Sequence, residues 1–407
     1  MDCTQDNQPG AASSKLGDKV YKNEPELVLT GSNASPVKTD VPKTNVLSGK
    51  LPSLDGWRAL SIMMVLGAHS TMHPTIHQLF VNPVLGPWVD GNLGVRFFFV
   101  ISGFLITYLL LREFQKNGRI DLWAFYTRRA LRILPVYFAY LAVVAVLQWT
   151  IKVHQPPISW LGVLTFTINF LPRDHIVGHL WSLSVEEQFY VLWPLTLIWL
   201  CSRKNLSRYV MVLAAPVIVA FIFHIIAREK AFPYPLHTLF TPYSSFLNFD
   251  SLAMGCIAGI LVAWRSAELK SLLAGKKHWI LTALGAVLIL LPWYSGIFHS
   301  QVVDFINEVT GRTLQAAGFA ILLVSSVLYP GRFPMVNWPV SSYIGRLSYS
   351  IYIWQNIYTY PPPTDHFPDN RWFRFPGSVV AAFATAAVSY HGLESPILKL
   401  KNRFRRY

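Results

Sequence analysis

Long apolar stretches recur along this chain of 407 residues and limit what it can fold into. A helix that crosses the hydrocarbon layer of a membrane needs about 20 mostly apolar residues. Stretches of that kind lie at roughly 57–76, 94–111, 131–151, 183–201, 209–227, 249–264, 279–298, 313–329, 342–360 and 376–393. Only 14% of the residues are charged, whereas soluble proteins average about 25%. The sequence therefore predicts an all-α membrane protein, a polytopic bundle of about ten transmembrane helices.

Two further segments differ from these stretches. Residues 1–50 are polar and contain no apolar run, which predicts a disordered cytoplasmic tail. Residues 158–171 are apolar but short and bracketed by prolines, and we interpret them as a re-entrant or surface-lying piece. The predicted organisation is a tail over 1–50, a transmembrane domain over 51–400 and a basic cytoplasmic C-terminus over 401–407.

The basic residues predict the orientation in the membrane. If the tail lies inside, the loops on its side carry more than twice as many lysines and arginines as the opposite loops, as the positive-inside rule requires. We therefore expect a multi-pass protein of the cytoplasmic (inner) membrane with both termini in the cytoplasm. The formal charge of +14 then faces anionic lipid headgroups rather than nucleic acid. Three scattered cysteines favour neither a disulfide framework nor a zinc site, and no metal is expected.

Arg58 and His69 are ionisable residues in the first stretch, where insertion of such a side chain costs roughly 2.5 kcal/mol or more. Eleven positions on a helix make three turns plus about 20° and rise about 16 Å, so both side chains share one face. A cation near the cytoplasmic surface with an imidazole above it suits a ligand that has an anionic head and a reactive tail. A neutral His69 can act as a base. The alternatives are pairing of Arg58 with Asp55 and a structural hydrogen bond from His69 to a neighbouring helix.

The second stretch combines small residues with a cation at its outer start. Gly94, Ser102 and Gly103 permit close helix approach, and we favour that packing role for them. Arg96 lies where it can meet an anion or a carboxylate.

A polar segment leads into the fourth stretch. Four of its residues lie in one stripe if the segment is helical: His179, Ser182, Glu186 and Tyr190. Glu186 and Glu187 have no structural need to be in an otherwise apolar helix. A salt bridge from Glu186 to Arg96 or Arg58 is the competing interpretation.

The predicted inner loop before the third stretch is basic. Arg128, Arg129 and Arg132 stand beside Tyr126 and suit a phosphate cradle. The same charges would also serve topology in any membrane protein, and loop composition does not separate these two roles.

Taken in order, these motifs resemble the acyltransferase-3 family of integral membrane O-acyltransferases, which modify bacterial polysaccharides, lipopolysaccharide and some macrolides. The resemblance rests on residues 54–58 with His69, and on 94–104, 125–135, 179–190, 249–255, 343–352 and 389–396. It covers about residues 51–400. Members often carry Asp where this chain has Arg96 and His where it has Gln355, and these departures concern the acceptor contacts more than the reaction.

The resemblance implies an acyl-CoA donor, usually acetyl-CoA, and a hydroxyl acceptor such as a glycan, a lipid-linked sugar or a macrolide. It also implies that Arg58 and His69 are the essential pair, with help from Arg129 and Arg132 at the inner face. We therefore predict a membrane-embedded enzyme that moves an acyl group, in the first place acetyl, from cytoplasmic acyl-CoA to a hydroxyl of a carbohydrate-type acceptor.

The predicted site assigns three roles. The residues are His69, Glu186 and Ser102 for catalysis; Arg58, Arg128, Arg129 and Arg132 for coenzyme A; and Arg96, His179, Trp181, Ser182 and Gln188 for the acceptor. His69 would take the acceptor proton or become transiently acylated, and Glu186 would orient an imidazole or hold the sugar. Ser102 or Gln188 would stabilise the oxyanion. A secondary transporter or flippase of a small anion or lipid-linked sugar is the alternative, although no inverted repeat is visible.

Overall fold

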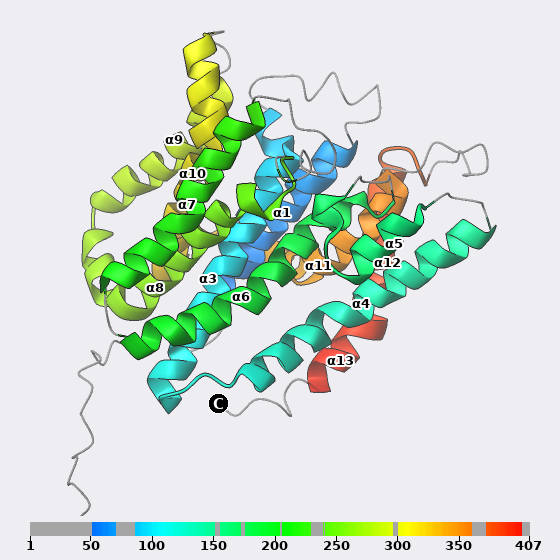
Figure 1. Cartoon of the computed structure of the whole chain (residues 1–407), viewed down its shortest axis with the longest axis horizontal. Helices are drawn as coiled ribbons and strands as arrows, with labels where there is room; N and C mark the ends of the chain where they lie inside the picture. The colour runs from blue at the N-terminus through cyan, green and yellow to red at the C-terminus, as the bar shows by residue number, and fades with distance from the viewer. Residues whose placement is uncertain are drawn as a thin grey trace, which may run out of the picture. The chain divides into compact units, whose positions relative to one another are not determined.

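The computed structural model places most of the chain in helices (Figure 1). It describes residues 51–70, 86–150, 155–171, 176–203, 206–228, 239, 241–295, 300–359 and 372–400. These residues contain no β-strand, so the all-α class predicted from the apolar stretches is confirmed. Both predicted tails, 1–50 and 401–407, lie outside the described residues.

The described part of each of the ten apolar stretches overlaps a helix. The ten helices are α1 (Pro52–Ser70), α3 (Gly91–Asn117), α4 (Leu122–Thr150), α6 (Trp181–Arg203), α7 (Leu206–Arg228), α8 (Phe249–Leu272), α9 (Lys277–Ser295), α10 (Gln301–Leu328), α11 (Pro339–Thr359) and α12 (Gly377–Ser389). Helices form here because a segment in hydrocarbon must satisfy its backbone N–H and C=O groups internally. In α3, the Asp90 side chain caps the first turn, and Gly118 follows the last turn with a φ of 67° that glycine adopts readily.

Six helices of the described part of the chain are long and apolar enough to cross a membrane. They are α3, α4, α7, α8, α9 and α10. The chain is therefore a multi-pass membrane protein. The predicted number of ten transmembrane helices is not confirmed. α12 has only 13 residues, and the polar residues that mark α1, α6 and α11 also lower their hydropathy.

Residues 158–171, interpreted as a re-entrant or surface-lying piece, form short elements. These are α5 (Pro157–Leu164) and the 3₁₀ turn η2 (Ile168–Phe170). A helix of 8 residues is about 12 Å long, whereas the hydrocarbon core is about 30 Å thick. α5 is therefore too short to be an eleventh membrane span.

Glycines bring α3 close to its neighbours. A Cβ atom on Gly103 would overlap the carbonyl oxygen of Leu252 in α8, and one on Gly255 would overlap that of Val100 in α3. Gly94 meets the backbone of α1 in the same way. The packing role that the sequence indicates for Gly94 and Gly103 is therefore confirmed. The close contact at Gly94 also fixes α3, which carries Ser102, against α1, which carries Arg58.

The start of α1 is held by α10 and α11. Nε1 of Trp57 donates to the hydroxyl of Ser326 at 2.7 Å, and a Cβ on Gly345 would overlap the carbonyl oxygen of Asp55. These contacts fix the rotation of α1 about its axis. Arg58 lies one position further along, about 100° round the helix from Trp57, and so faces a different set of neighbours.

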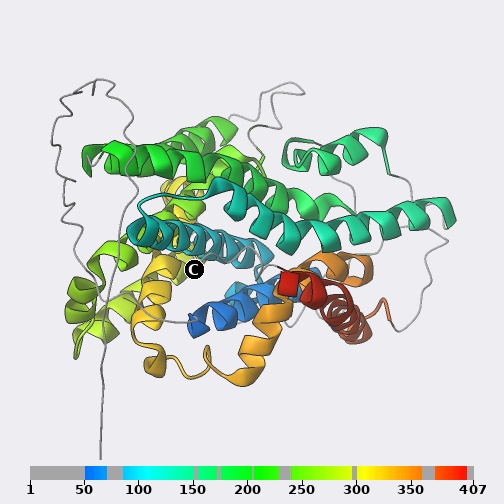
Figure 2. The same cartoon turned by 90° about the horizontal axis from the view of Figure 1, so that it is seen from below.

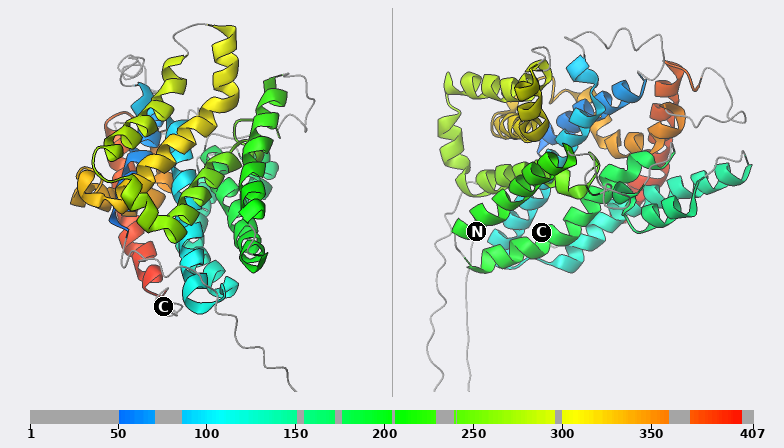
Figure 3. Two further views of the ribbon diagram at one scale, coloured as in Figure 1. Left: turned by 90° about the vertical axis from the view of Figure 1, so that its left-hand side faces the viewer. Right: turned by 45° about the horizontal axis from the view of Figure 1, so that its top comes forward.

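The remaining helices complete the bundle. α9 and α10 lie side by side (Figure 3), and α13 (Ser395–Leu400) lies near α4 (Figure 2). The beginnings of α3 and α10 and the ends of α7 and α9 line one common cavity and therefore share one end of the bundle.

Candidate active site

Ser102, Glu186 and Tyr190 form a hydrogen-bonded cluster between α3 and α6. The hydroxyl of Ser102 donates to Oε1 of Glu186 at 2.8 Å, and the hydroxyl of Tyr190 donates to Oε2 of the same carboxylate at 2.8 Å. Both carboxylate oxygens therefore accept a hydroxyl proton. Within the described residues, Glu186 makes no ion pair with Arg58 or Arg96, so the competing salt-bridge interpretation does not hold there.

Three arginines surround this cluster. The guanidinium of Arg129 lies over the ring of Tyr190, 5.0 Å from its centroid. Arg58 and Arg129 each lie close enough to Arg132 and Glu186 to interact electrostatically with both. The helices α1, α4 and α6 thus bring three cations and a carboxylate to one place. We name Arg58, Arg129, Arg132, Ser102, Glu186 and Tyr190 the arginine–carboxylate cluster.

His69 lies at the other end of α1, next to α11. Its Nδ1 is 2.8 Å from Oε1 of Gln355, which also accepts the hydroxyl proton of Thr359 at 3.0 Å. With the Gln355 amide in this orientation, its oxygen accepts the proton of Nδ1, and the lone pair of His69 lies on Nε2. His69 is therefore held in the tautomer whose Nε2 can act as a base.

His179 lies close to His69, in the 3₁₀ turn η3 (Gly178–Leu180) that directly precedes α6. Its Nε2 is 3.2 Å from the carbonyl oxygen of Ile353 in α11. The ring of Tyr140 packs edge-on against His179, with the centroids 5.4 Å apart. The structure therefore brings two predicted site residues together as an imidazole pair, His69 and His179.

The arginine–carboxylate cluster and the imidazole pair are aligned along two helices. Arg58 and His69 are eleven positions apart on α1, and Tyr190 and His179 are eleven positions apart at α6. The two pairs are in opposite order along the chain, because Arg58 lies near Tyr190 and His69 lies near His179. Both side chains of α1 therefore face the continuous segment formed by η3 and α6, about 16 Å apart along the axis of α1.

Several predicted site residues lie elsewhere or are engaged with the protein itself. Arg128 forms an ion pair with Glu113 at 3.4 Å and does not share the surroundings of Arg129. Trp181 is buried against the rings of Phe99 and Tyr243. These contacts give Arg128 and Trp181 a packing role.

Ser182 and Gln188 also bind other parts of the bundle. The hydroxyl of Ser182 meets that of Tyr352 in α11. Nε2 of Gln188 donates to the carbonyl oxygen of Phe166 at 2.8 Å and to Oδ1 of Asn169 at 3.0 Å. Gln188 therefore fastens the α5–η2 segment to α6, away from the imidazole pair.

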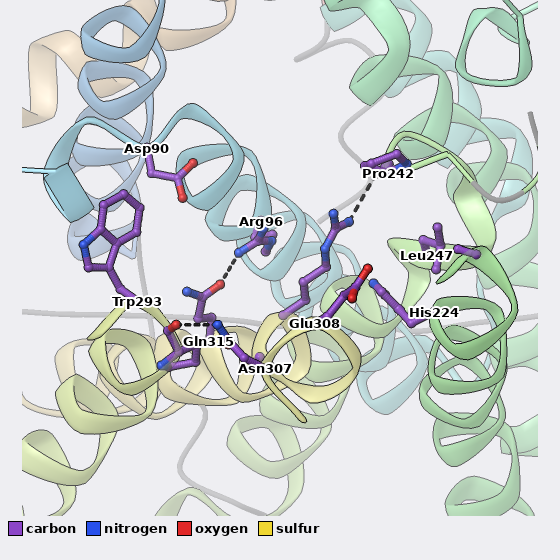
Figure 4. Close-up of a pocket in the computed structure, with 13 residues that line it drawn as sticks. Asp90, Arg96, His224, Pro242, Leu247, Trp293, Asn307, Glu308 and Gln315 are labelled. Carbon is purple, nitrogen blue, oxygen red and sulfur yellow. Dashed lines mark hydrogen bonds between the residues drawn. The ribbon is translucent and has the colours of Figure 1, made fainter. Parts of the chain in front are cut away.

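Arg96 lies apart from both groups. It donates to Oε1 of Gln315 in α10 and lines a cavity at the end of the bundle where α3 begins (Figure 4). Glu186 and Ser102, predicted to act with His69, belong instead to the cluster around Arg58. Their hydrogen bonds join them to each other and to Tyr190 rather than to an imidazole.

Two residues gain importance only from the structure. Gln355 orients His69, although the sequence marks it only as a departure from the family pattern. Arg312 lines the cavity that contains Arg96. Its signal in the sequence is a charge next to the start of an apolar stretch, where a surface loop is the simpler interpretation.

Comparison with known proteins agrees with these motifs. A family model described as an acyltransferase domain matches residues 51–391. The chain belongs to the acyltransferase-3 family. Peptidoglycan O-acetyltransferase OatA of Listeria monocytogenes is 26% identical over 384 residues, which cover 88% of this chain and 57% of that protein. O-acetyltransferase OatA of Staphylococcus aureus is 25% identical over 331 residues, which cover 75% of this chain and 50% of that protein.

The matches cover a larger share of this chain than of its relatives. The chain spans about half the length of the curated relatives it matches. No solved structure matches the chain.

Proposed function

We propose that this chain is a membrane O-acyltransferase that moves an acetyl group from acetyl-CoA to a hydroxyl of a glycan. The observation that carries the proposal is that Arg58, which neighbours Arg129 and Arg132 of α4, shares one face of α1 with His69. Membership of the acyltransferase-3 family supports acyl transfer. The names of the two OatA relatives, one of which specifies peptidoglycan, support a glycan acceptor.

Arg58, Arg129 and Arg132 would bind the phosphates of coenzyme A. A cluster of guanidiniums suits this task because each offers several N–H donors in a plane that matches phosphate oxygens. Glu186 would hold these cations together while its two hydroxyl donors keep it in place. The orientation with this cluster at the cytoplasmic side, and with both termini in the cytoplasm, belongs to the same proposal.

The pantetheine arm would then run along α1 toward His69. Nε2 of His69 would take the proton of the acceptor hydroxyl while the hydroxyl oxygen attacks the thioester carbon. The carbon–sulfur bond breaks, the coenzyme A thiolate leaves, and the proton passes from His69 to the sulfur. In the other order of events, Nε2 attacks the thioester carbon, the carbon–sulfur bond breaks and the coenzyme A thiolate leaves. The acceptor oxygen then attacks the acetyl-imidazole, the bond to Nε2 breaks, and the thiolate takes the acceptor proton.

Radiolabelled acetyl-CoA tests this function. The purified full chain in detergent is incubated with labelled acetyl-CoA and soluble peptidoglycan fragments, and we expect label on the fragments. His69→Ala should lower transfer at least about 100-fold, the usual contribution of a general base. His391→Ala removes an exposed histidine bonded to Tyr343 and serves as the matched control.

Other outcomes of this experiment, and of a transport assay on the protein in vesicles, decide between the alternatives. Wild-type transfer by folded His69→Ala would remove the imidazole from the mechanism. Transport of labelled sugar into vesicles without any acetyl transfer would favour the transporter. Label on the protein in the absence of acceptor, released by neutral hydroxylamine and absent from His69→Ala, would identify the acetyl-imidazole route.

A further inference from the structure

A cavity of about 300 Å³ lies among α3, α7, α9 and α10, at the end of the bundle where α3 begins. Its volume is at the lower end of the range of about 300–1,000 Å³ for small-molecule sites. Figure 4 shows Arg96, Glu308 and His224 reaching toward this space from three different helices. The hydrogen bonds of Ser102 and Glu186 lie on another side of α3, so this cavity is separate from the arginine–carboxylate cluster.

Two arginines of the cavity are held by neutral groups. Arg96 donates to the side-chain oxygen of Gln315, and Arg312 donates to the carbonyl oxygen of Pro242 at 3.3 Å. Among the described residues, neither guanidinium forms an ion pair with a carboxylate. The carboxylates of Asp90 and Asp250 lie near both arginines and offset their charges, but they do not contact either guanidinium as an ion pair. Each guanidinium has five N–H donors, so those not used by Gln315 and Pro242 can donate to the two oxygens of a bound carboxylate.

His224 supplies a hydrogen-bond acceptor in the same cavity. The residue is 6% exposed, and its Nδ1 lies 2.7 Å from the carbonyl oxygen of Ala220. That contact assigns the proton to Nδ1, so Nε2 carries the lone pair. Nε2 is buried and has no hydrogen-bond partner among the described residues. A buried acceptor left in this state indicates a ligand group that donates to it, such as a hydroxyl.

The rest of the lining suits a sugar ring. Glu308 and Asp90 offer carboxylate oxygens that accept hydroxyl protons. Trp293 is 36% exposed and offers an aromatic face to the apolar side of a ring. We propose that this cavity binds a carboxylate-bearing sugar, with the sugar carboxylate between Arg96 and Arg312 and a ring hydroxyl donating to Nε2 of His224. This inference rests on the proposed glycan acceptor, and it assigns the recognition of a charged sugar unit to a place apart from His69.

Calorimetric titration of the purified full chain with glucuronate, glucose or acetate tests this inference in the absence of an acyl donor. Hydrogen bonds to charged groups contribute about 1.5–3 kcal/mol, so glucuronate should bind at least about tenfold more tightly than glucose. Glucuronate should also bind more tightly than acetate, because acetate lacks the ring. Arg312→Gln should remove most of the preference for glucuronate. The matched control, Arg265→Gln, removes an exposed arginine on α8 and should leave binding unchanged.

The outcomes separate this inference from the proposed function. Equal affinity for glucuronate and glucose in the unmodified protein would overturn the inference, even if acetyl transfer occurs and whether or not Arg312→Gln folds. Equal affinity for acetate and glucuronate would reduce the cavity to a small-anion site and overturn the assignment to a sugar. Selective glucuronate binding without acetyl transfer from acetyl-CoA would support the cavity and contradict the proposed function.

Discussion

Replacing Gln355 with leucine tests how the imidazole of His69 is held. Oε1 of Gln355 is 2.8 Å from Nδ1 of His69, and leucine offers no acceptor at this place. Nδ1 then loses this partner, and the tautomer with the lone pair on Nε2 is no longer favoured. A hydrogen bond contributes a net 0.5–1.5 kcal/mol, or roughly 2- to 12-fold in rate. We therefore expect a kcat about tenfold lower, against at least about 100-fold for complete loss of the base.

The assay is steady-state transfer from labelled acetyl-CoA, with kcat and KM measured separately. KM for acetyl-CoA should not change, because Gln355 lies at the His69 end of α1 and not at the arginines. Thr359→Val is the matched control, since it removes the other donor to the same oxygen of Gln355 at 3.0 Å. Gln355→Glu keeps an acceptor and should recover most of the kcat. A wild-type kcat in Gln355→Leu, or an equal loss in Thr359→Val, would refute the positioning role.

Four further substitutions probe the other parts of the bundle. Arg58→Gln should raise KM for acetyl-CoA about tenfold through loss of a charge-assisted hydrogen bond, and an unchanged KM would exclude Arg58 from donor binding. Arg129→Gln should also raise KM for acetyl-CoA. The guanidinium of Arg128 pairs with Glu113, so Arg128→Gln should keep a KM near that of the wild type. Equal effects of the two substitutions would contradict the separation of the two arginines. Gly345→Val adds methyl groups where the backbone of α1 passes, so the Tm of the detergent-solubilised protein should fall by several degrees, and an unchanged Tm would show that α1 and α11 do not need this close approach.

Much of the fold could be predicted from the sequence, because the physical requirements are local. An apolar run of membrane length has to form a helix to satisfy its backbone, and the described part of every run is mainly helical. The shared face of Arg58 and His69 follows from helix periodicity alone. The packing role of Gly103 also follows from its residue type, since only glycine lets the backbone of α8 approach so closely.

The partners of these residues could not be predicted, because they depend on which helices meet. His69 contacts Gln355, which is 286 positions away, and Arg96 contacts Gln315, which is 219 positions away. Neighbouring arginines such as Arg128 and Arg129 point about 100° apart on a helix. The sequence places both in one motif, but in the structure Arg128 pairs with Glu113 and lies outside the arginine–carboxylate cluster.

The most direct measurement of the central claim is an experimental structure of the full chain with a non-hydrolysable thioether analogue of acetyl-CoA. The account predicts density for the phosphates among Arg58, Arg129 and Arg132, and the thioether sulfur next to Nε2 of His69. Phosphates bound at Arg96 and Arg312 instead, or an analogue whose sulfur ends away from His69, would contradict it.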